Sequence, residues 1–142
     1  MKVIAFVALL TTTLASGHAC AALWECTVKA VYENDKGTLK PVAQTLSTRT
    51  DDVLFFDEAS GLFRHVDDFR GGLNDWKQTF NVLQVGDDAL NPTLAVFQKK
   101  GTGMQVAMLI TINTYLPGIE KPFTFVDDLT DIVTGTCRKR AR

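Results

Sequence analysis

Apolar and polar residues alternate along most of the chain after residue 22, and a period of two is typical of half-buried strands. The alternation is clearest over residues 104–113, where one face of the expected strand carries Met104, Val106, Met108, Ile110 and Ile112. Further strands are predicted at 24–33, 38–44, 53–56, 62–66, 80–85, 94–99, 123–126 and 132–137. Short strands at this spacing, separated by turn residues, are typical of an antiparallel barrel or sandwich.

Turn-forming residues separate these segments and refine the prediction. Residues 34–37 (Asn-Asp-Lys-Gly) predict a tight turn, because Gly37 can adopt the positive φ that such turns require. Pro41 lacks a backbone N–H, which predicts an edge strand over residues 38–44. The continuous apolar run 53–56 predicts a strand covered on both faces. A helix is the alternative over residues 74–83, where apolar residues recur at helix-like spacing at Leu73, Trp76, Phe80 and Leu83.

The first 21 residues have the three parts of a cleavable signal peptide. Lys2 supplies a positive charge, residues 3–14 are mostly apolar, and Ala19-Cys20-Ala21 has the small residues that signal peptidase accepts. The apolar run is shorter than the roughly 20 residues that span a bilayer. We expect cleavage after Ala21, with Ala19 and Ala22 as alternatives. Lipidation of Cys20 is a rival hypothesis, although Gly17 and His18 match the lipoprotein pattern poorly.

The remaining residues, 22–142, are expected to form a single β domain with a short basic C-terminal tail. Cleavage after Ala21 leaves two cysteines, Cys26 and Cys137, and two cysteines in an exported protein usually pair. The predicted disulfide joins the first strand to the last, which favours a closed barrel of about eight strands over an open sandwich. The expected location is therefore periplasmic or secreted.

Charge and hydropathy exclude some classes of function. Without residues 1–21 the chain has 14 basic residues (15 less Lys2) against 16 acidic ones, a net charge of −2. This balance provides no field for nucleic acid. Beyond the signal segment, no run is apolar enough for a transmembrane helix, so we do not expect an integral membrane protein.

The sequence contains no recognisable catalytic set, metal-binding motif or cofactor-binding motif. Paired acids in expected loops, such as Asp51-Asp52 and Asp127-Asp128, lack the spacing of a calcium-binding loop and are more typical of solvated turns. His65 is the one histidine after residue 21. A small hydrolase-like enzyme would use His65 with loop carboxylates such as Asp57, Asp67 or Asp68, assisted by Ca²⁺.

A non-enzymatic binding or protein-interaction module is the leading hypothesis for function. Its ligand would be a small apolar molecule inside the barrel or another exported protein at a loop end. Met104, Val106, Met108 and Ile110 are the candidate ligand-binding residues, because flexible methionines suit irregular ligands. A secreted inhibitor, toxin or assembly subunit is a further alternative, with the edge strand around Pro41 as its contact.

Overall fold

The computed structural model describes residues 21–45, 48–66, 76–100, 105–127 and 131–141. Its ten strands are β1 (Leu23–Asp35), β2 (Thr38–Val42), β3 (Val53–Asp57), β4 (Leu62–Val66), β5 (Trp76–Thr79), β6 (Asn81–Gln84), β7 (Thr93–Lys100), β8 (Gln105–Ile112), β9 (Lys121–Asp127) and β10 (Asp131–Arg140). All the strand pairs are antiparallel, which confirms the all-β prediction.

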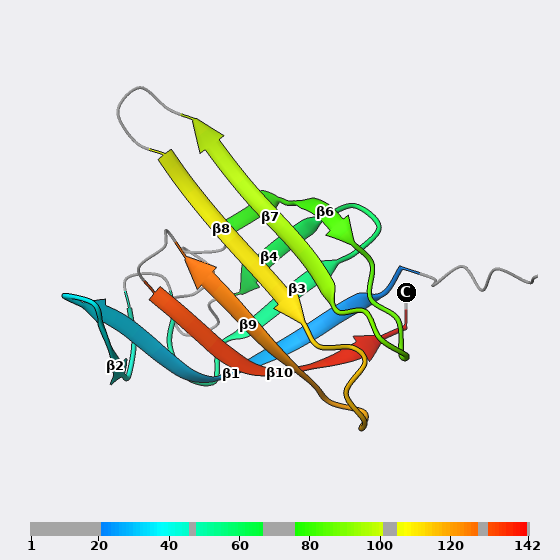
Figure 1. Ribbon diagram of the computed structural model, residues 1–142, viewed down its shortest axis with the longest axis horizontal. Helices are drawn as coiled ribbons and strands as arrows, with labels where there is room; N and C mark the ends of the chain where they lie inside the picture. The colour runs from blue at the N-terminus through cyan, green and yellow to red at the C-terminus, as the bar shows by residue number, and fades with distance from the viewer. Residues whose placement is uncertain (1–20, 46–47, 67–75, 101–104, 128–130, 142) are drawn as a thin grey trace, which may run out of the picture.

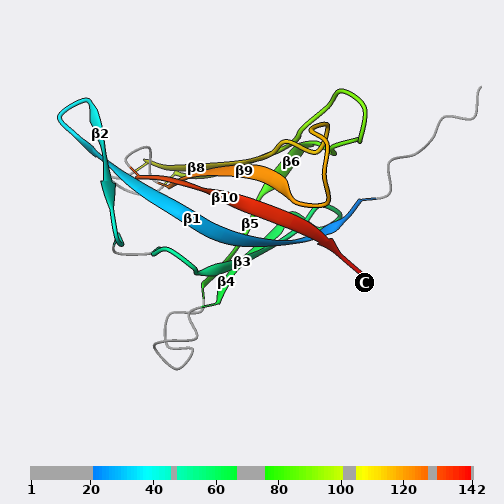
Figure 2. The same cartoon turned by 90° about the horizontal axis from the view of Figure 1, so that it is seen from below.

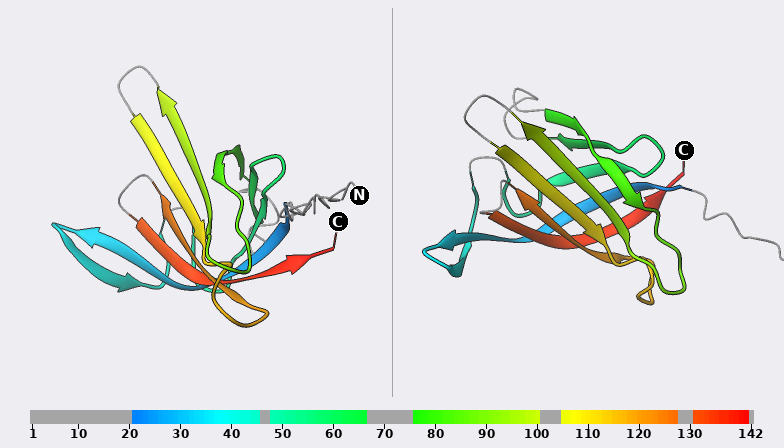
Figure 3. Two further views of the ribbon diagram at one scale, coloured as in Figure 1. Left: turned by 45° about the vertical axis from the view of Figure 1, so that its right-hand side comes forward. Right: turned by 45° about the horizontal axis from the view of Figure 1, so that its top comes forward.

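The strands form one nearly closed, barrel-shaped sheet in the order β5-β4-β3-β1-β10-β9-β8-β7-β6 (Figure 1). The first and last long strands, β1 and β10, lie side by side at its centre. Seen from below, this pair runs between the layer of β8 and β9 and the layer of β3 and β4 (Figure 2). The barrel alternative is therefore the one that the structure adopts, and the β1–β2 and β7–β8 hairpins project from it (Figure 3).

The two ends of the sheet path are joined by a single residue, Phe80, between β5 and β6. Its amide donates to the carbonyl of Gly61, with 2.8 Å between nitrogen and oxygen. Gly61 has a φ of +69°, and a Cβ there would lie 2.0 Å from the Phe80 carbonyl oxygen, so glycine is required at this crossing. The helical alternative is wrong over residues 76–83, where two short strands meet at the buried Phe80, and residues 73–75 lie outside the described residues.

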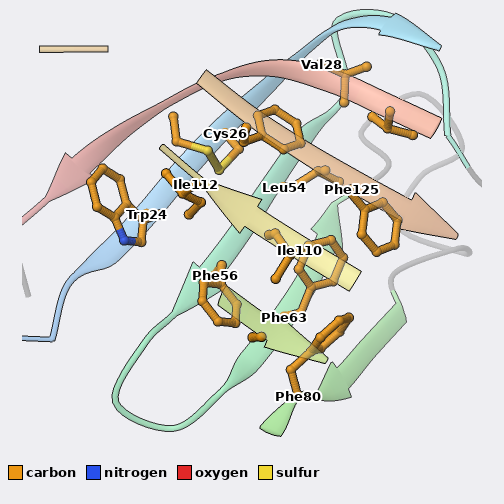
Figure 4. Packing of buried hydrophobic residues seen from close by; sticks show 14 of the residues in the cluster. Trp24, Cys26, Val28, Leu54, Phe56, Phe63, Phe80, Ile110, Ile112 and Phe125 are labelled. Carbon is orange, nitrogen blue, oxygen red and sulfur yellow. A yellow bond between two sulfur atoms is a disulfide. The ribbon is translucent and has the colours of Figure 1, made fainter. Parts of the chain in front are cut away.

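Phenylalanine rings fill the space between the two sides of the sheet (Figure 4). The Phe63 ring centroid lies 5.0 Å from that of Phe125 and 5.3 Å from that of Phe80. Phe80 also lies 5.8 Å from Phe97 and 6.3 Å from Phe56. Since aromatic pairs at these separations attract beyond their buried area, this cluster fastens the closing strands β5 and β6 to the rest of the barrel.

Strand β3 differs from its expected pattern. Leu54 and Phe56 are buried, whereas Val53 and Phe55 are partly exposed. The prediction that residues 53–56 are covered on both faces is wrong, because only the inner face of this antiparallel sheet is packed against other strands. Residues 53–56 are apolar on both faces of the strand, but successive side chains still alternate between partly exposed and buried.

The disulfide between Cys26 and Cys137 is present, as predicted. The two cysteines face each other across the β1–β10 pair, and both side chains are fully buried. A disulfide of this kind is typical of proteins in oxidising compartments. The turn after β1 is also as expected, with positive φ angles at Lys36 and Gly37, and β2 pairs with β1 alone on the edge that Pro41 indicated.

Candidate functional site

One end of the barrel gathers five segments, and we call it the loop end. It holds the start of β1, the β3–β4 turn, the β6–β7 loop (residues 85–92), the β8–β9 loop (residues 113–120) and the end of β10 (Figure 1). These segments come together because adjacent strands are antiparallel, so alternate connections lie at the same end.

The β6–β7 loop is held in one conformation by Asp87. Its carboxylate accepts hydrogen bonds from the amides of Ala89 at 2.9 Å, Leu90 at 2.8 Å and Asn91 at 3.0 Å. The Asn91 side-chain amide donates to the other oxygen at 2.6 Å. These donors, with the Leu90 amide contributing most, hold the pKa of Asp87 well below its usual range. The loop is therefore ordered by a carboxylate that stays ionised.

Thr114 joins the β8–β9 loop to the β6–β7 loop. Its hydroxyl lies 2.6 Å from the carbonyl oxygen of Asn91 and 2.9 Å from that of Asp87, and the residue is buried. Gly86 packs against it so closely that a Cβ there would lie 2.4 Å from the Thr114 hydroxyl oxygen. Lys121 donates to the Leu116 carbonyl at 2.5 Å. Both loops are thus fixed to each other and to the barrel.

The two fixed loops carry large apolar side chains in solvent. Leu90 is 82% exposed, Ile119 is 88% exposed and Tyr115 is 40% exposed. We call these three residues the loop-end patch. Single exposed leucines are common on protein surfaces, but these three side chains are carried by two ordered loops that Thr114 holds together, and exposed apolar side chains on such loops are a feature of binding surfaces.

Beneath these loops lies a buried carboxylate, Glu58, in the β3–β4 turn. Glu58 is 4% exposed. One of its oxygens accepts a hydrogen bond from the Thr93 hydroxyl, and the other accepts from the Ala22 amide at 2.5 Å. Thr93 in turn accepts from the Gly86 amide at 3.1 Å. This network connects the start of β1 to the β6–β7 loop.

No family model, curated protein or solved structure matches this chain.

His65 is 2% exposed and lies on β4, away from the loop end. Its Nε2 is 2.9 Å from an oxygen of Asp52, which also accepts from the Arg49 amide at 2.9 Å. The Arg49 Nε donates to the other Asp52 oxygen at 3.0 Å. The cluster fastens residues 49–52 to β4, and its burial keeps the imidazole away from solvent.

The acids expected near His65 are placed differently. Asp57 lies at the opposite end of the β3–β4 hairpin. It is three residues along β3 from Leu54, which pairs with His65, and this separation corresponds to roughly 10 Å. Its carboxylate accepts from the Ala59 amide at 3.1 Å and the Ser60 hydroxyl at 2.8 Å. Asp67 and Asp68 lie outside the described residues. The structure therefore brings Asp52, not Asp57, to His65.

The candidate ligand-binding residues lie along β8. Ile110 is fully buried in the core, and Met108 is partly buried against it. Val106 belongs to the same strand, although its side chain and the whole of Met104 lie outside the described residues. Ligand binding by this set stays a prediction.

A small polar hollow lies on the outer face of β1 and β10. It measures about 120 Å³ and is lined by Glu25, Thr27, Glu120, Thr136, Cys137 and Arg138. Arg138 donates to Glu25 at 2.8 Å, and this hydrogen bond, with a second from Arg140, holds the pKa of Glu25 below its usual range. Since small-molecule sites usually measure roughly 300 Å³ or more, this hollow fits an ion pair rather than a ligand.

Within the described ranges, no group of three histidine, cysteine or acidic side chains is arranged to hold a metal. The same residues include no helix long and apolar enough to cross a bilayer.

The sequence patterns did not identify the residues of the loop end. Leu90 precedes Asn91-Pro92, and Ile119 follows Pro117-Gly118. Both residues therefore lie among residue types that favour turns rather than strands. A large aliphatic residue inside a turn cluster is the available clue, because such a position is exposed. No sequence pattern indicated that Glu58 would be buried, because its hydrogen-bond partners lie 35 and 36 residues away in the sequence.

Proposed function

We propose that the protein is exported, either to a periplasm or to the exterior, and acts there as a non-enzymatic protein-interaction module. The ordered signal-peptide features of residues 1–21 and the buried Cys26–Cys137 disulfide support export. The partner is another exported protein that offers an apolar pocket to the loop-end patch.

The exposure of Leu90 and Ile119 carries this proposal. Each is more than four-fifths exposed although its loop is ordered by hydrogen bonds. Exposed aliphatic side chains gain about 1.5–3 kcal/mol each when a partner buries them fully. Because the loops are already ordered, little conformational entropy is lost on binding. A pre-ordered, apolar loop pair is therefore suited to docking into a protein.

The alternatives have less support. A small apolar ligand would have to share the interior with the rings of Phe56, Phe63, Phe80, Phe97 and Phe125. An enzyme would have to use His65 while it is buried beside Asp52. A partner can bind the loop-end patch without rearrangement of the barrel, and for this reason we prefer the protein-interaction module.

Site-specific photocrosslinking in the cells that produce the protein tests this function. A photoreactive phenylalanine analogue is placed at position 90, at position 119 or, as a matched control, at position 39. Leu39 is 50% exposed on β2, away from the loop end. We expect one protein partner to be crosslinked from positions 90 and 119 and not from position 39.

A binding measurement with the crosslinked partner completes the test. Leu90→Ser should weaken the complex by about 10- to 100-fold, whereas Leu39→Ser should leave it unchanged. Equal crosslinking from all three positions, or no effect of Leu90→Ser, would refute the proposed surface. If the crosslinks join only two copies of this chain, the loop-end patch mediates self-association, and the proposal of a different protein partner would be refuted.

A further inference from the structure

Ala22 and Glu58 are joined by two hydrogen bonds, and each residue donates one of them. The Ala22 nitrogen lies 2.5 Å from a carboxylate oxygen of Glu58, and the Glu58 amide donates to the Ala22 carbonyl at 3.0 Å. Glu58 is almost completely buried. The chain is therefore held at residue 22, one residue before β1 begins.

The charge of Glu58 is incompletely compensated in the full-length chain. Its two described side-chain donors are the Thr93 hydroxyl and the Ala22 amide, and both are neutral. No lysine, arginine or histidine among the described residues forms an ion pair with it. Removing a carboxylate from water without a cationic partner is costly. A positive charge at the Ala22 nitrogen would offset that cost.

We propose that hydrolysis of the Ala21–Ala22 bond supplies this charge, and that the new α-ammonium group of Ala22 pairs with Glu58. This inference rests on the export part of the proposed function. Water is the co-reactant: the C–N bond breaks, Ala21 keeps the carboxylate, and the Ala22 nitrogen takes up protons to become an ammonium. The neutral amide that now contacts Glu58 becomes a cation at the same place.

The contact distinguishes the three cleavage positions that the sequence allows. Cleavage after Ala22 would remove the nitrogen and the carbonyl that hold Glu58. Cleavage after Ala19 would leave a neutral amide at residue 22 and keep a third cysteine, Cys20. Cleavage after Ala21 preserves both contacts, makes one of them ionic and leaves only the two cysteines that are bridged.

The new terminus would also be connected to the loop-end patch. Glu58 accepts from the Thr93 hydroxyl, and Thr93 accepts from the amide of Gly86 at the start of the β6–β7 loop. A charged partner that fixes Glu58 therefore supports the loop that carries Leu90. Removal of residues 1–21 would thus add an ionic contact to the hydrogen-bond network beneath a β6–β7 loop that is already ordered.

Intact mass spectrometry and N-terminal sequencing of the exported protein test the position of cleavage. We expect Ala22 as the first residue, with two hydrogens missing because of the disulfide. A mature chain that begins at Cys20 or at Leu23, or one in which Cys20 is acylated, would overturn the inference.

A variant cycle tests the ion pair. Protein that begins at Ala22 is compared with protein carrying Gly-Ser before Ala22, each with Glu58 and with Glu58→Gln. The extension should lower the Tm by about 5 °C or more when Glu58 is present, and by little in the Glu58→Gln background. An equal loss in both backgrounds would mean that the extension acts by steric hindrance, and the ion pair would be refuted.

A second measurement covers the case in which Glu58→Gln does not fold. Acetylation of the α-amine by an activated ester should be at least about 10-fold slower in protein that begins at Ala22 than in the Gly-Ser form, because pairing with a buried carboxylate keeps the amine protonated. Equal rates would overturn the pairing. Retention of residues 1–21 would remove the export on which both proposals depend, whereas loss of crosslinking with this pairing intact would refute only the partner surface.

Discussion

Reduction of the Cys26–Cys137 disulfide is expected to remove much of the stability of the barrel. The bridge spans 111 residues, almost the whole described chain. The chain-entropy relation for a loop of this length gives about 16 cal/mol/K, or about 5 kcal/mol at 25 °C. Since small domains are stable by about 5–15 kcal/mol in total, the reduced protein should be close to unfolding.

Urea titrations of the oxidised and reduced protein measure this difference, with far-ultraviolet circular dichroism as the signal. The thiols stay in place, so reduction leaves no cavity, unlike replacement of the cysteines. With a slope of about 2 kcal/mol per molar urea, the midpoint should fall by about 2 M or more. A change in unfolding free energy below about 1 kcal/mol would refute the argument, because the bridge would then not restrict the unfolded chain.

Three further predictions concern single residues. Phe80→Ala should cost about 3–5 kcal/mol in a urea titration, because it removes the ring that joins β5 and β6 to the core; a loss below about 1 kcal/mol would contradict this role. Asp52→Ala should cost about 1–3 kcal/mol by leaving His65 Nε2 without its acceptor, and Asp51→Asn, which alters an exposed neighbour and keeps a residue type that tolerates its φ of 71°, is the control. Asp87 has a lowered pKa in the folded state, so its contribution is complete above its unfolded pKa of about 3.9 and is lost as the pH falls through the folded value. The stability difference between wild type and Asp87→Asn should therefore shrink in titrations below about pH 4, and a difference independent of pH would contradict it.

Local patterns predicted the parts of the fold that depend on neighbouring residues. The turn at Lys36-Gly37, the edge strand with Pro41 and the inward face of β8 all follow from short-range chemistry. The disulfide was predictable because two cysteines remain after residue 21 and the N-terminal segment indicates export.

Contacts between distant residues were not predictable in the same way. The single-residue junction at Phe80 depends on where β4 and Gly61 lie. The pairing of His65 with Asp52 depends on the register of β3 and β4, and alternation alone does not set that register. The loop-end patch emerges only when the β6–β7 and β8–β9 loops are placed side by side by Thr114.

The pairing of β1 with β10 has a consequence for how the chain folds. Leu23 faces Arg140 and Cys26 faces Cys137, so the central pair of the sheet cannot form until β10 has been synthesised. Contacts of such long sequence separation slow folding. Local hairpins such as β3–β4 and β7–β8 depend only on neighbouring segments, so closure of the barrel, rather than formation of these hairpins, is the step that must await β10.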